Sequence, residues 1–423
     1  MTAKNIVLAT IGTRGDVQPY TALALGLKAA GYKVKLAAPE NFENWVRGMG
    51  LDFARCGPDS KAFVTAPEIR EYLEKSVLVQ IRDARKLGLD FIKSITEDIY
   101  FATRDADAII FHPKADFAVD VAEAKKIPAI MAAFQPFTPT REFPIMILPW
   151  VTLGPWLNKA SYGMIYLSRV LYNKHLNQCR RDFLDLPPRP LVTHPTTIGN
   201  ERLPVFYAFS EHVVPRPHDW PEHVHITGYW FLDENPAWEV PADLKVFIEA
   251  GAPPLYVGFG SMPLSDPVAG GRMISEALGA SGLRAVMARG WAELIPTKCG
   301  RDLQNIFVID EAPHEHLFPH MAAVVHHGGA GTTAAGLRAG RPTLVCPFLV
   351  DQPFWGRRIA RLGAGPEPLP TKKWTSAELE HSFQTLYGIG DFYVNAQRLA
   401  DRLSEEDGVA RAVELVREIV GRP

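Results

Sequence analysis

Short, continuously apolar runs alternate with amphipathic stretches at both ends of this chain. Near the N-terminus the pattern predicts a strand over 5–11, a helix from Pro19 to Gly31 and a strand over 34–38. Such runs are typical of parallel strands buried on both faces, which helices join by right-handed crossovers. The same alternation returns later, with strands predicted over 254–259, 284–288, 306–309, 323–327 and 342–346.

The middle of the chain has a different character. From Phe134 to Trp238, prolines are interspersed with aromatic residues, and this composition is too apolar for a disordered linker. We interpret the segment as an ordered, irregular connection that includes helix over 156–184. A polar, proline-containing stretch at its end predicts a domain boundary near 236–240.

These patterns predict an α/β protein of two doubly wound, Rossmann-like domains that face each other across a cleft. The N-terminal domain is expected over residues 1–236 and the C-terminal domain over 237–405. The length of 423 residues agrees with this expectation, because it exceeds the usual size of one domain. The remaining stretch, 406–423, has the apolar periodicity of an amphipathic helix.

Composition and charge exclude several classes of protein. With 47% hydrophobic and 22% charged residues, the chain resembles neither a disordered protein nor a coiled coil. Its 45 basic residues are balanced by 47 acidic ones, so no basic surplus favours nucleic-acid binding. The first apolar run is too short to span a membrane, and four cysteines without close spacing indicate a reduced, cytoplasmic enzyme.

A glycine-rich loop follows one predicted strand and precedes a predicted helix. It reads His327-Gly328-Gly329-Ala330-Gly331-Thr332-Thr333. Backbone amides at the N-terminus of a helix bind anions, and glycines let the backbone approach a phosphate closely. The alternative is a packing turn with a threonine that caps the helix. The glycines and hydroxyls together favour the anion site.

The next predicted strand is followed by Asp351 and Gln352. Because the carboxyl ends of parallel strands meet at one edge of a sheet, these side chains are expected to face the same crevice as the glycine-rich loop. A carboxylate beside an amide suits a ligand that is rich in hydroxyls. Taken alone, the pair is equally consistent with an aspartate that caps the next helix.

These motifs together resemble the donor-binding signature of the family 1 glycosyltransferases, which have the GT-B fold and use UDP-sugars. The resemblance runs through Pro313-His314, the loop 327–333, Pro347 and Asp351-Gln352. The N-terminal segment 12–20, GTRGDVQPY, is similar to the sterol 3β-glucosyltransferase branch, with bacterial antibiotic-aglycone transferases close by. The middle of the chain matches no motif of the family.

The resemblance implies which residues hold a UDP-glucose donor, with no metal or other cofactor. Plant members stack a tryptophan on the uracil at the position of Glu311, so Trp291 is a candidate replacement, although a lone tryptophan is equally consistent with the core. The loop would hold the diphosphate, and Asp351 with Gln352 the sugar hydroxyls. The full set implied for the donor is Ser261, Trp291, Pro313, His314, His327, Gly329, Gly331, Thr332, Thr333, Asp351 and Gln352.

The catalytic base is where this chain departs from the plant members. Their histidine stands in Gly-His-x-x-Pro, whereas this chain has Asp16 at that position, between Gly15 and Pro19. We expect Asp16 to remove the acceptor proton, helped by an apolar acceptor that desolvates it and raises its pKa. Plant members orient their histidine with an aspartate, and the matching position here is His112, which suggests a reversed pair. The alternatives are a helix cap or an ion pair with Arg14 for Asp16, and an ordinary strand-end residue for His112.

The proline-rich middle supplies candidates for an apolar acceptor pocket. The sequence therefore predicts an inverting glycosyltransferase that moves glucose from UDP-glucose to a sterol-like hydroxyl. A transferase acting on an antibiotic or polyketide aglycone, with a UDP- or dTDP-sugar, is a second interpretation. A nucleotide-sugar epimerase and a non-catalytic sugar-nucleotide-binding protein are interpretations of other classes. The candidate acceptor residues are Phe134, Phe137, Phe143, Met146, Trp150 and Trp156.

Two further features bear on metals and membranes. Asp105-Ala106-Asp107 resembles the metal-binding DxD of the other main glycosyltransferase fold, but it precedes a predicted strand and is expected to lie away from the crevice. No other cluster of residues suggests a metal site. The C-terminal stretch 406–423 is expected to pack back across the domains, as in the family, and peripheral membrane contact is left open.

Overall fold

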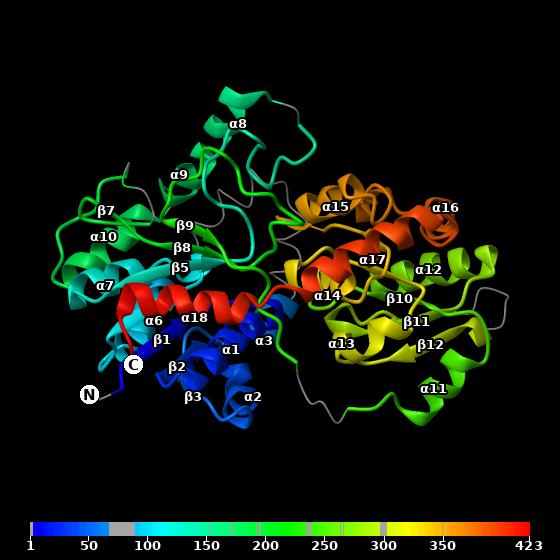
Figure 1. The fold of residues 1–423 in the computed structure, drawn as a ribbon, viewed down its shortest axis with the longest axis horizontal. Helices are drawn as coiled ribbons and strands as arrows, with labels where there is room; N and C mark the ends of the chain where they lie inside the picture. The colour runs from blue at the N-terminus through cyan, green and yellow to red at the C-terminus, as the bar shows by residue number, and fades with distance from the viewer. Residues whose placement is uncertain are drawn as a thin grey trace.

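The structure, a computed structural model, contains two parallel β-sheets, one in each half of the chain (Figure 1). This arrangement confirms the predicted α/β fold of two domains. The predicted boundary falls partly on residues 234–237, which lie outside the described residues, so it stays a prediction. The structure describes residues 3–66, 89–151, 153–170, 172–191, 193, 196–233, 238–262, 264, 266–296, 303–348 and 350–423.

The N-terminal sheet has seven strands in the order β3-β2-β1-β4-β5-β8-β9, and every pairing is parallel. The inner strand β1 is buried on both faces, because Ile6 and Leu8 belong to one core cluster and Val7 and Ala9 to another. The strands are β1 (Asn5–Ala9), β2 (Lys33–Ala38), β3 (Asp52–Arg55), β4 (Ala108–Phe111), β5 (Ala129–Ala133), β8 (Val205–Tyr207) and β9 (Val224–Ile226).

The C-terminal sheet has five parallel strands in the order β12-β11-β10-β13-β14. Each strand lies within one residue of the range that the apolar runs predict. The strands are β10 (Leu255–Gly258), β11 (Ala285–Ala288), β12 (Ile306–Ile309), β13 (Ala323–His326) and β14 (Thr343–Val345).

Each sheet has a point where the strand order reverses. In the N-terminal sheet β1 lies between β2 and β4, and in the C-terminal sheet β10 lies between β11 and β13. Connections leave in opposite directions there, which opens a crevice outside the carboxyl ends of the strands. Asp16 and His112 follow β1 and β4, and Ser261 and His327 follow β10 and β13. The fold thus places both predicted halves of the site at such crevices.

Helices cover both sheets. In the N-terminal domain they are α1 (Arg14–Ala29), α2 (Glu43–Gly48), α3 (Ser60–Thr65), α6 (Leu89–Ala102) and α7 (Ala118–Lys125). In the C-terminal domain they are α11 (Ala242–Glu249), α12 (Pro267–Ser281), α13 (His314–Leu317), α14 (Ala330–Arg338), α15 (Gln352–Arg361), α16 (Ser376–Gly388) and α17 (Gly390–Ser404).

The last helix returns to the N-terminal domain. α17 packs on α14, whereas α18 (Gly408–Val420) packs on α1, and its apolar residues join the cluster beneath β1 and β2 (Figure 1). The Tyr32 hydroxyl donates to the Gly421 carbonyl at 2.7 Å and ties the end of the chain to this domain. The C-terminal helix therefore joins the end of the chain to the core of the first domain.

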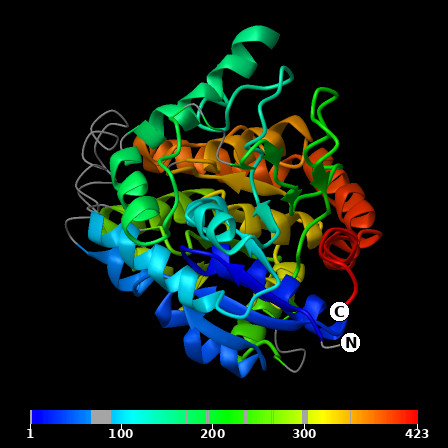
Figure 2. The ribbon, with the colours of Figure 1, turned by 90° about the vertical axis from the view of Figure 1, so that its left-hand side faces the viewer.

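The proline-rich middle contains more regular structure than the sequence predicts. It includes β8 and β9, which complete the seven-stranded sheet, and the hairpin of β6 (Thr197–Ile198) and β7 (Glu201–Arg202). The interpretation of this part as irregular holds for most of its length but misses these four strands, because strands of two or three residues show no periodicity. The single predicted helix is three helices: α8 (Pro155–Ser161), α9 (Gly163–Val170) and α10 (Asn173–Asp182). Figures 1 and 2 show that α8 projects from the body of the domain.

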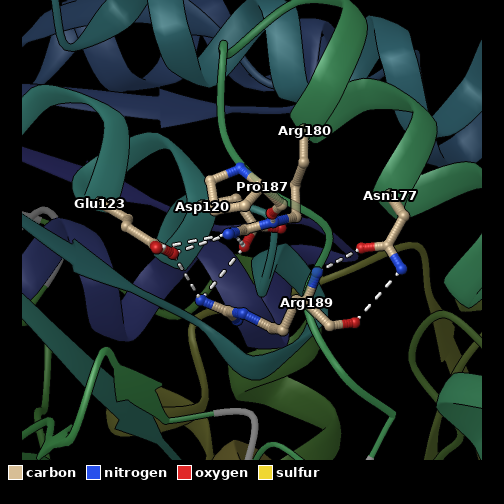
Figure 3. A network of polar contacts seen from close by, with 6 residues as sticks. All are labelled: Asp120, Glu123, Asn177, Arg180, Pro187 and Arg189. Atoms are coloured by element: carbon tan, nitrogen blue, oxygen red, sulfur yellow. Dashed lines mark hydrogen bonds and ion pairs between the residues drawn. The ribbon is translucent and has the colours of Figure 1, made fainter.

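A buried network of charges holds α10 against α7 (Figure 3). The Arg180 guanidinium donates to Asp120 at 2.5 Å, to Glu123 at 2.9 Å and to the Pro187 carbonyl at 2.9 Å. Arg189 Nη2 lies 3.2 Å from Asp120 and 3.1 Å from Glu123. Two cations thus compensate two carboxylates, and the network fixes the base of the α8–α10 segment.

Candidate active site between the two domains

Asp16 lies in the first turn of α1, directly beyond β1. The helix begins at Arg14, earlier than predicted, because the Asp16 carboxylate accepts the Thr13 N–H at 2.9 Å and so caps its first turn. Gly12 makes room for this carboxylate: its φ is +137°, and a Cβ there would lie 2.0 Å from Asp16 Oδ2. The glycine and aspartate of the motif therefore depend on each other.

The partner of Asp16 is Lys114, a residue that the sequence analysis does not single out. Lys114 Nζ lies 2.7 Å and 2.8 Å from the two carboxylate oxygens, whereas Arg14 stacks over the ring of Trp45 at 5.4 Å. Burial by itself would raise the pKa of Asp16, but the charge of Lys114, acting together with His112 and with the hydrogen bonds from Lys114 and Thr13, holds the pKa below its ordinary value. Asp16 therefore does form an ion pair, but its partner is Lys114 and not Arg14, as the alternative interpretation expected.

His112 lies beside Asp16 at the end of β4. Its Nδ1 accepts the Lys114 N–H at 3.2 Å, which leaves the proton on Nε2, and Nε2 lies 3.8 Å from Asp16 Oδ1. No hydrogen-bond partner of Nε2 is found within the described residues. Burial lowers the pKa of His112 to about 3, so the ring is neutral at pH 7. The structure thus brings His112 and Asp16 together, but the distance between their side chains is too long for a hydrogen bond.

Across the cleft, α14 presents its N-terminus without a side-chain cap. The N-cap residue is Gly329, and no side chain accepts a hydrogen bond from the first turn. The alternative of a capping threonine is therefore wrong: Thr333 is fully buried in the helix, and its hydroxyl lacks a partner among the described residues. The free amides of such a turn are suited to binding an anion. Gly331 and Thr332 lie in the same turn.

The ring of His327 packs closely against the glycine loop. A Cβ at Gly329 would lie 2.4 Å from His327 Nε2, so a larger residue there would displace the ring. Burial lowers the pKa of His327 to about 4. His327 is thus a neutral hydrogen-bond donor at pH 7.

Asp351 joins the two domains. Its Oδ2 accepts hydrogen bonds from Gln135 Nε2 of the N-terminal domain and from Trp355 Nε1, both at 3.0 Å. It occupies the N-cap position of α15, yet its side chain makes no capping hydrogen bond, so the capping alternative is wrong. Burial raises the pKa of Asp351, opposed by the hydrogen bond from Gln135 and the nearby charge of Lys114. Gln135 is a second residue of the site that the sequence gives no reason to select.

Both polar atoms of the Gln352 side-chain amide already have partners within the protein. Its Oε1 accepts the Phe348 N–H at 2.7 Å, and its Nε2 contacts Met262 Sδ at 3.1 Å. The side chain is buried. A sugar that binds Gln352 would have to replace one of these contacts, so its assignment to the sugar stays a prediction.

The other predicted donor residues surround the same sheet edge. Trp291 donates its backbone N–H to the Gly260 carbonyl at 2.8 Å, which joins its loop to that of Ser261. Pro313 precedes α13, and the His314 ring stacks on Phe318 at 4.4 Å with its Nε2 3.5 Å from the Tyr256 hydroxyl. His314 is therefore packed against the core of the domain, and burial lowers its pKa to about 4.

The candidate acceptor residues separate into three environments. Phe134 and Met146 are buried in the two N-terminal core clusters, and Phe134 stacks on His112 at 5.2 Å. These two assignments are corrected: the side chains support the site and do not face open space, because both are almost fully enclosed by protein. Phe137 and Phe143 are half-buried, and Phe143 reaches Phe354 of the C-terminal domain at 5.9 Å. Trp150 and Trp156 are exposed.

The structure gives no arrangement that would hold a metal within the residues it describes. No group of three or more histidine, cysteine, aspartate or glutamate side chains converges there. Asp105 and Asp107 precede β4 at the amino end of the strand, where Asp107 accepts the Asn5 N–H at 2.7 Å. The DxD segment thus lies at the opposite end of the sheet from Asp16.

Two crevices that face each other, one with a buried carboxylate and one with a bare helix N-terminus, define a GT-B glycosyltransferase. Solved structures of this class share the fold: the glycotransferase of kitacinnamycin covers 100% of both chains with a TM-score of 0.74 and 17% identity. The calicheamicin glycosyltransferase CalG4 has a TM-score of 0.70 and 18% identity, and the match covers 100% of this chain and 99% of that one. Residues 6–144 match the glycosyltransferase family 28 N-terminal domain, and 298–418 match the erythromycin biosynthesis protein CIII-like C-terminal domain.

The chain belongs to the sterol 3-beta-glucosyltransferase family of GT-B enzymes. Two sterol 3-beta-glucosyltransferases of Arabidopsis thaliana are 36% and 37% identical over 96% and 97% of this chain. One from Aspergillus clavatus is 34% identical over 97% of it. The chain spans 64% and 67% of the length of the two plant relatives and 29% of the fungal one.

Proposed function

We propose that this protein transfers glucose from UDP-glucose to the 3β-hydroxyl of a sterol or a similar rigid, hydrophobic alcohol. The observation that carries the proposal is the placement of Asp16 and Asp351 on facing domains, with Lys114 close enough for its charge to act on both. A base for the acceptor and a group for the sugar then stand on opposite sides of one cleft. The names of the relatives support the sterol acceptor and the glucosyl group.

The proposed reaction is a single displacement with inversion at the anomeric carbon. The acceptor hydroxyl gives its proton to an Asp16 oxygen, and its electron pair forms the new bond to the anomeric carbon. The bond from that carbon to the β-phosphate oxygen breaks, and its electron pair leaves with UDP. The first-turn amides of α14 and the N–H of His327 would stabilise the diphosphate, so the reaction requires no metal. The remaining donor and acceptor residues keep the roles predicted for them, apart from Phe134, Met146 and Thr333, whose side chain is buried and whose N–H donates to the Gly329 carbonyl at 2.9 Å.

The proposal is tested by incubation with UDP-glucose or, in parallel, dTDP-glucose and a panel of sterols, flavonoids and macrolide aglycones, with products identified by mass. We expect a glucoside with a sterol and none with the D16N variant. Glycosides formed only with aglycones, or only from dTDP-glucose, would favour the antibiotic-type transferase. An altered sugar nucleotide formed without acceptor would favour an epimerase. Absence of any product, with UDP still bound, would favour a non-catalytic binding protein.

We also propose that the α8–α10 segment contacts an anionic bilayer surface and brings the acceptor side of the cleft to it. Trp156 is 77% exposed on α8, and Trp150 in the preceding loop is also exposed. Apart from Arg180, whose side chain is buried, residues 155–182 carry four basic residues and one acidic one, whereas the chain as a whole is balanced. Tryptophan prefers the membrane interface, and basic residues favour anionic lipids. Among the described residues no helix is both long and apolar enough to cross a bilayer.

This contact predicts vesicle binding that depends on the two tryptophans. The double variant W150S/W156S should bind phosphatidylserine-containing vesicles about tenfold more weakly than the natural protein, because it loses apolar surface that enters the interface. The F101S variant is the control, since Phe101 is as exposed as Trp150 but lies on α6. Vesicle co-sedimentation measures the difference, and equal loss in both variants would contradict the contact.

A further inference from the structure

Lys114 is placed to act on both sides of the cleft. It lies in the short helix Pro113–Ala115 that follows β4, and its backbone is held by the hydrogen bond to His112 Nδ1. Its side chain, in contrast, is 54% exposed and reaches Asp16 only through its terminal ammonium. Its charge also acts on Asp351 at the start of α15 in the other domain. The ammonium therefore contacts the proposed base, and its charge also reaches the carboxylate of the proposed donor site.

The contact with Asp16 is unfavourable for the reaction as drawn. A carboxylate that accepts two hydrogen bonds from an ammonium is stabilised in its charged form, and it accepts a proton less readily. Asp16 would be a better base if the ammonium moved away when the substrates bind. The lysine stem is long and flexible, so the group can move several ångströms without any change of the backbone.

The donor supplies the competing anion. A diphosphate bound at α14 brings about two negative charges toward the first turn of that helix. α14 contacts α1, and its first residue, Ala330, packs against the core cluster that α1 forms with β1 and β2 and also against the cluster that spans both domains. The anion would thus bind directly beside the domain that carries Lys114. A bound diphosphate competes with Asp16 for the same cation.

We propose that Lys114 is a donor-binding residue contributed by the N-terminal domain, which leaves Asp16 for the diphosphate of the sugar nucleotide when the donor binds. The inference rests on the proposed function, because it takes Asp16 as the base and the α14 terminus as the diphosphate site. The movement has two consequences: the donor is held by a cation that a metal would otherwise provide, and Asp16 is released only when a donor is present.

The first test is the affinity for UDP and dTDP, which requires no catalysis. Calorimetric titration should show about tenfold weaker binding of both nucleotides to K114M, since a charge-assisted hydrogen bond is lost, and near-natural binding to K114R. The matched control is K93M, because Lys93 is equally exposed, at 54%, and forms its ion pair with Glu97 on α6, away from the cleft. K114Q replaces K114M if the latter does not fold.

The second test is the pH dependence of kcat at saturating donor. The titratable groups around Asp16 are Lys114, His112 and Tyr20, with Asp351 across the cleft, and only the first is changed. If Lys114 has already left Asp16, the acid limb of K114M coincides with that of the natural enzyme. If it stays there, its removal raises the pKa of Asp16 and moves the limb to higher pH.

The outcomes separate the two proposals. Weaker nucleotide binding by K114M with an unmoved acid limb supports the role of Lys114. Unchanged binding by K114M, or an acid limb moved to higher pH, overturns it while the proposed function stands. Failure of the natural protein itself to bind either nucleotide overturns the proposed function, and the inference with it.

Discussion

Replacement of Asp16 by asparagine should lower kcat by about 10²- to 10⁴-fold, the range expected when a general base is removed. Asparagine has nearly the same shape and can still accept the Thr13 N–H that caps α1, so the fold of the first turn is kept. It cannot take a proton from the acceptor hydroxyl. Initial rates with UDP-glucose and the preferred acceptor measure the effect.

The matched control for this variant is D98N. Asp98 resembles Asp16 in its surroundings: its side chain is 11% exposed against 10%, it pairs with Arg55 at 3.0 Å, and it accepts the Gly57 N–H at 3.1 Å. It lies on α6 and has no predicted catalytic role. D98N should keep its rate within about twofold, because Asp98 has no predicted part in the reaction and the loss of its contacts is expected to affect stability instead. Natural turnover in D16N, or an equal loss in D98N, would remove Asp16 from the role of base.

Asp16 also predicts a dependence of stability on pH. Its pKa in the folded protein is below the ordinary 3.8, so the carboxylate contributes stability at pH values above that, and the contribution is lost as the pH falls through the folded pKa. His112 acts in the same direction at higher pH: its folded pKa of about 3 lies below the ordinary 6.5, so the unfolded chain takes up the proton first and stability falls once the pH drops below 6.5. The acid side of the unfolding profile should therefore begin near the ordinary histidine range.

Replacement of Arg180 by methionine should lower the free energy of unfolding by about 3–5 kcal/mol, the usual cost of removing one partner from a buried ion pair. Arg180 is buried and donates to Asp120, Glu123 and a carbonyl (Figure 3). Without it, two carboxylates share the single cation of Arg189. Denaturant unfolding at pH 7 measures the loss.

The control is the neighbouring Arg181, which is exposed and pairs only with the adjacent, equally exposed Asp182 at 3.2 Å. R181M should change stability by less than about 0.5 kcal/mol. Burial by itself would raise the pKa of Glu123, but the hydrogen bonds from Arg180 lower it below 4.5, so the difference between R180M and the natural protein should narrow as the pH falls below that value. A large loss in R181M, or none in R180M, would contradict this account of the network.

The strands predicted for the C-terminal domain agree closely with the structure, because each is marked by the residues of its own short segment of sequence. Strands of a parallel sheet are buried on both faces, so their apolar runs stand out between polar helix starts and glycine turns. The strands in the middle of the chain lack such long apolar runs, so the local pattern does not predict them. β8 and β9 have only three residues each, and they become strands because the edge of β5 offers backbone hydrogen bonds to β8, and β8 in turn offers them to β9.

The residues of the site also divide into those that a local sequence pattern predicts and those that only the tertiary structure reveals. Asp16, His112, the glycine loop and Asp351 follow strands, and motifs at strand ends can be recognised in a sequence. Lys114 and Gln135 carry no motif: the one meets Asp16 across 98 residues and the other meets Asp351 across 216. Such pairs exist only after two strands or two domains have been brought together.

The sequence by itself thus determined the two-domain α/β fold, the family and the strand ends at which the chemistry is expected, because these depend on local patterns of apolar residues and glycines. Only the tertiary structure decided what surrounds each group. It placed an ammonium on the proposed base, made His112 and His327 neutral by burial, and moved Phe134 and Met146 from the pocket to the core. Charge state and exposure depend on neighbours distant in the chain, which no local pattern contains.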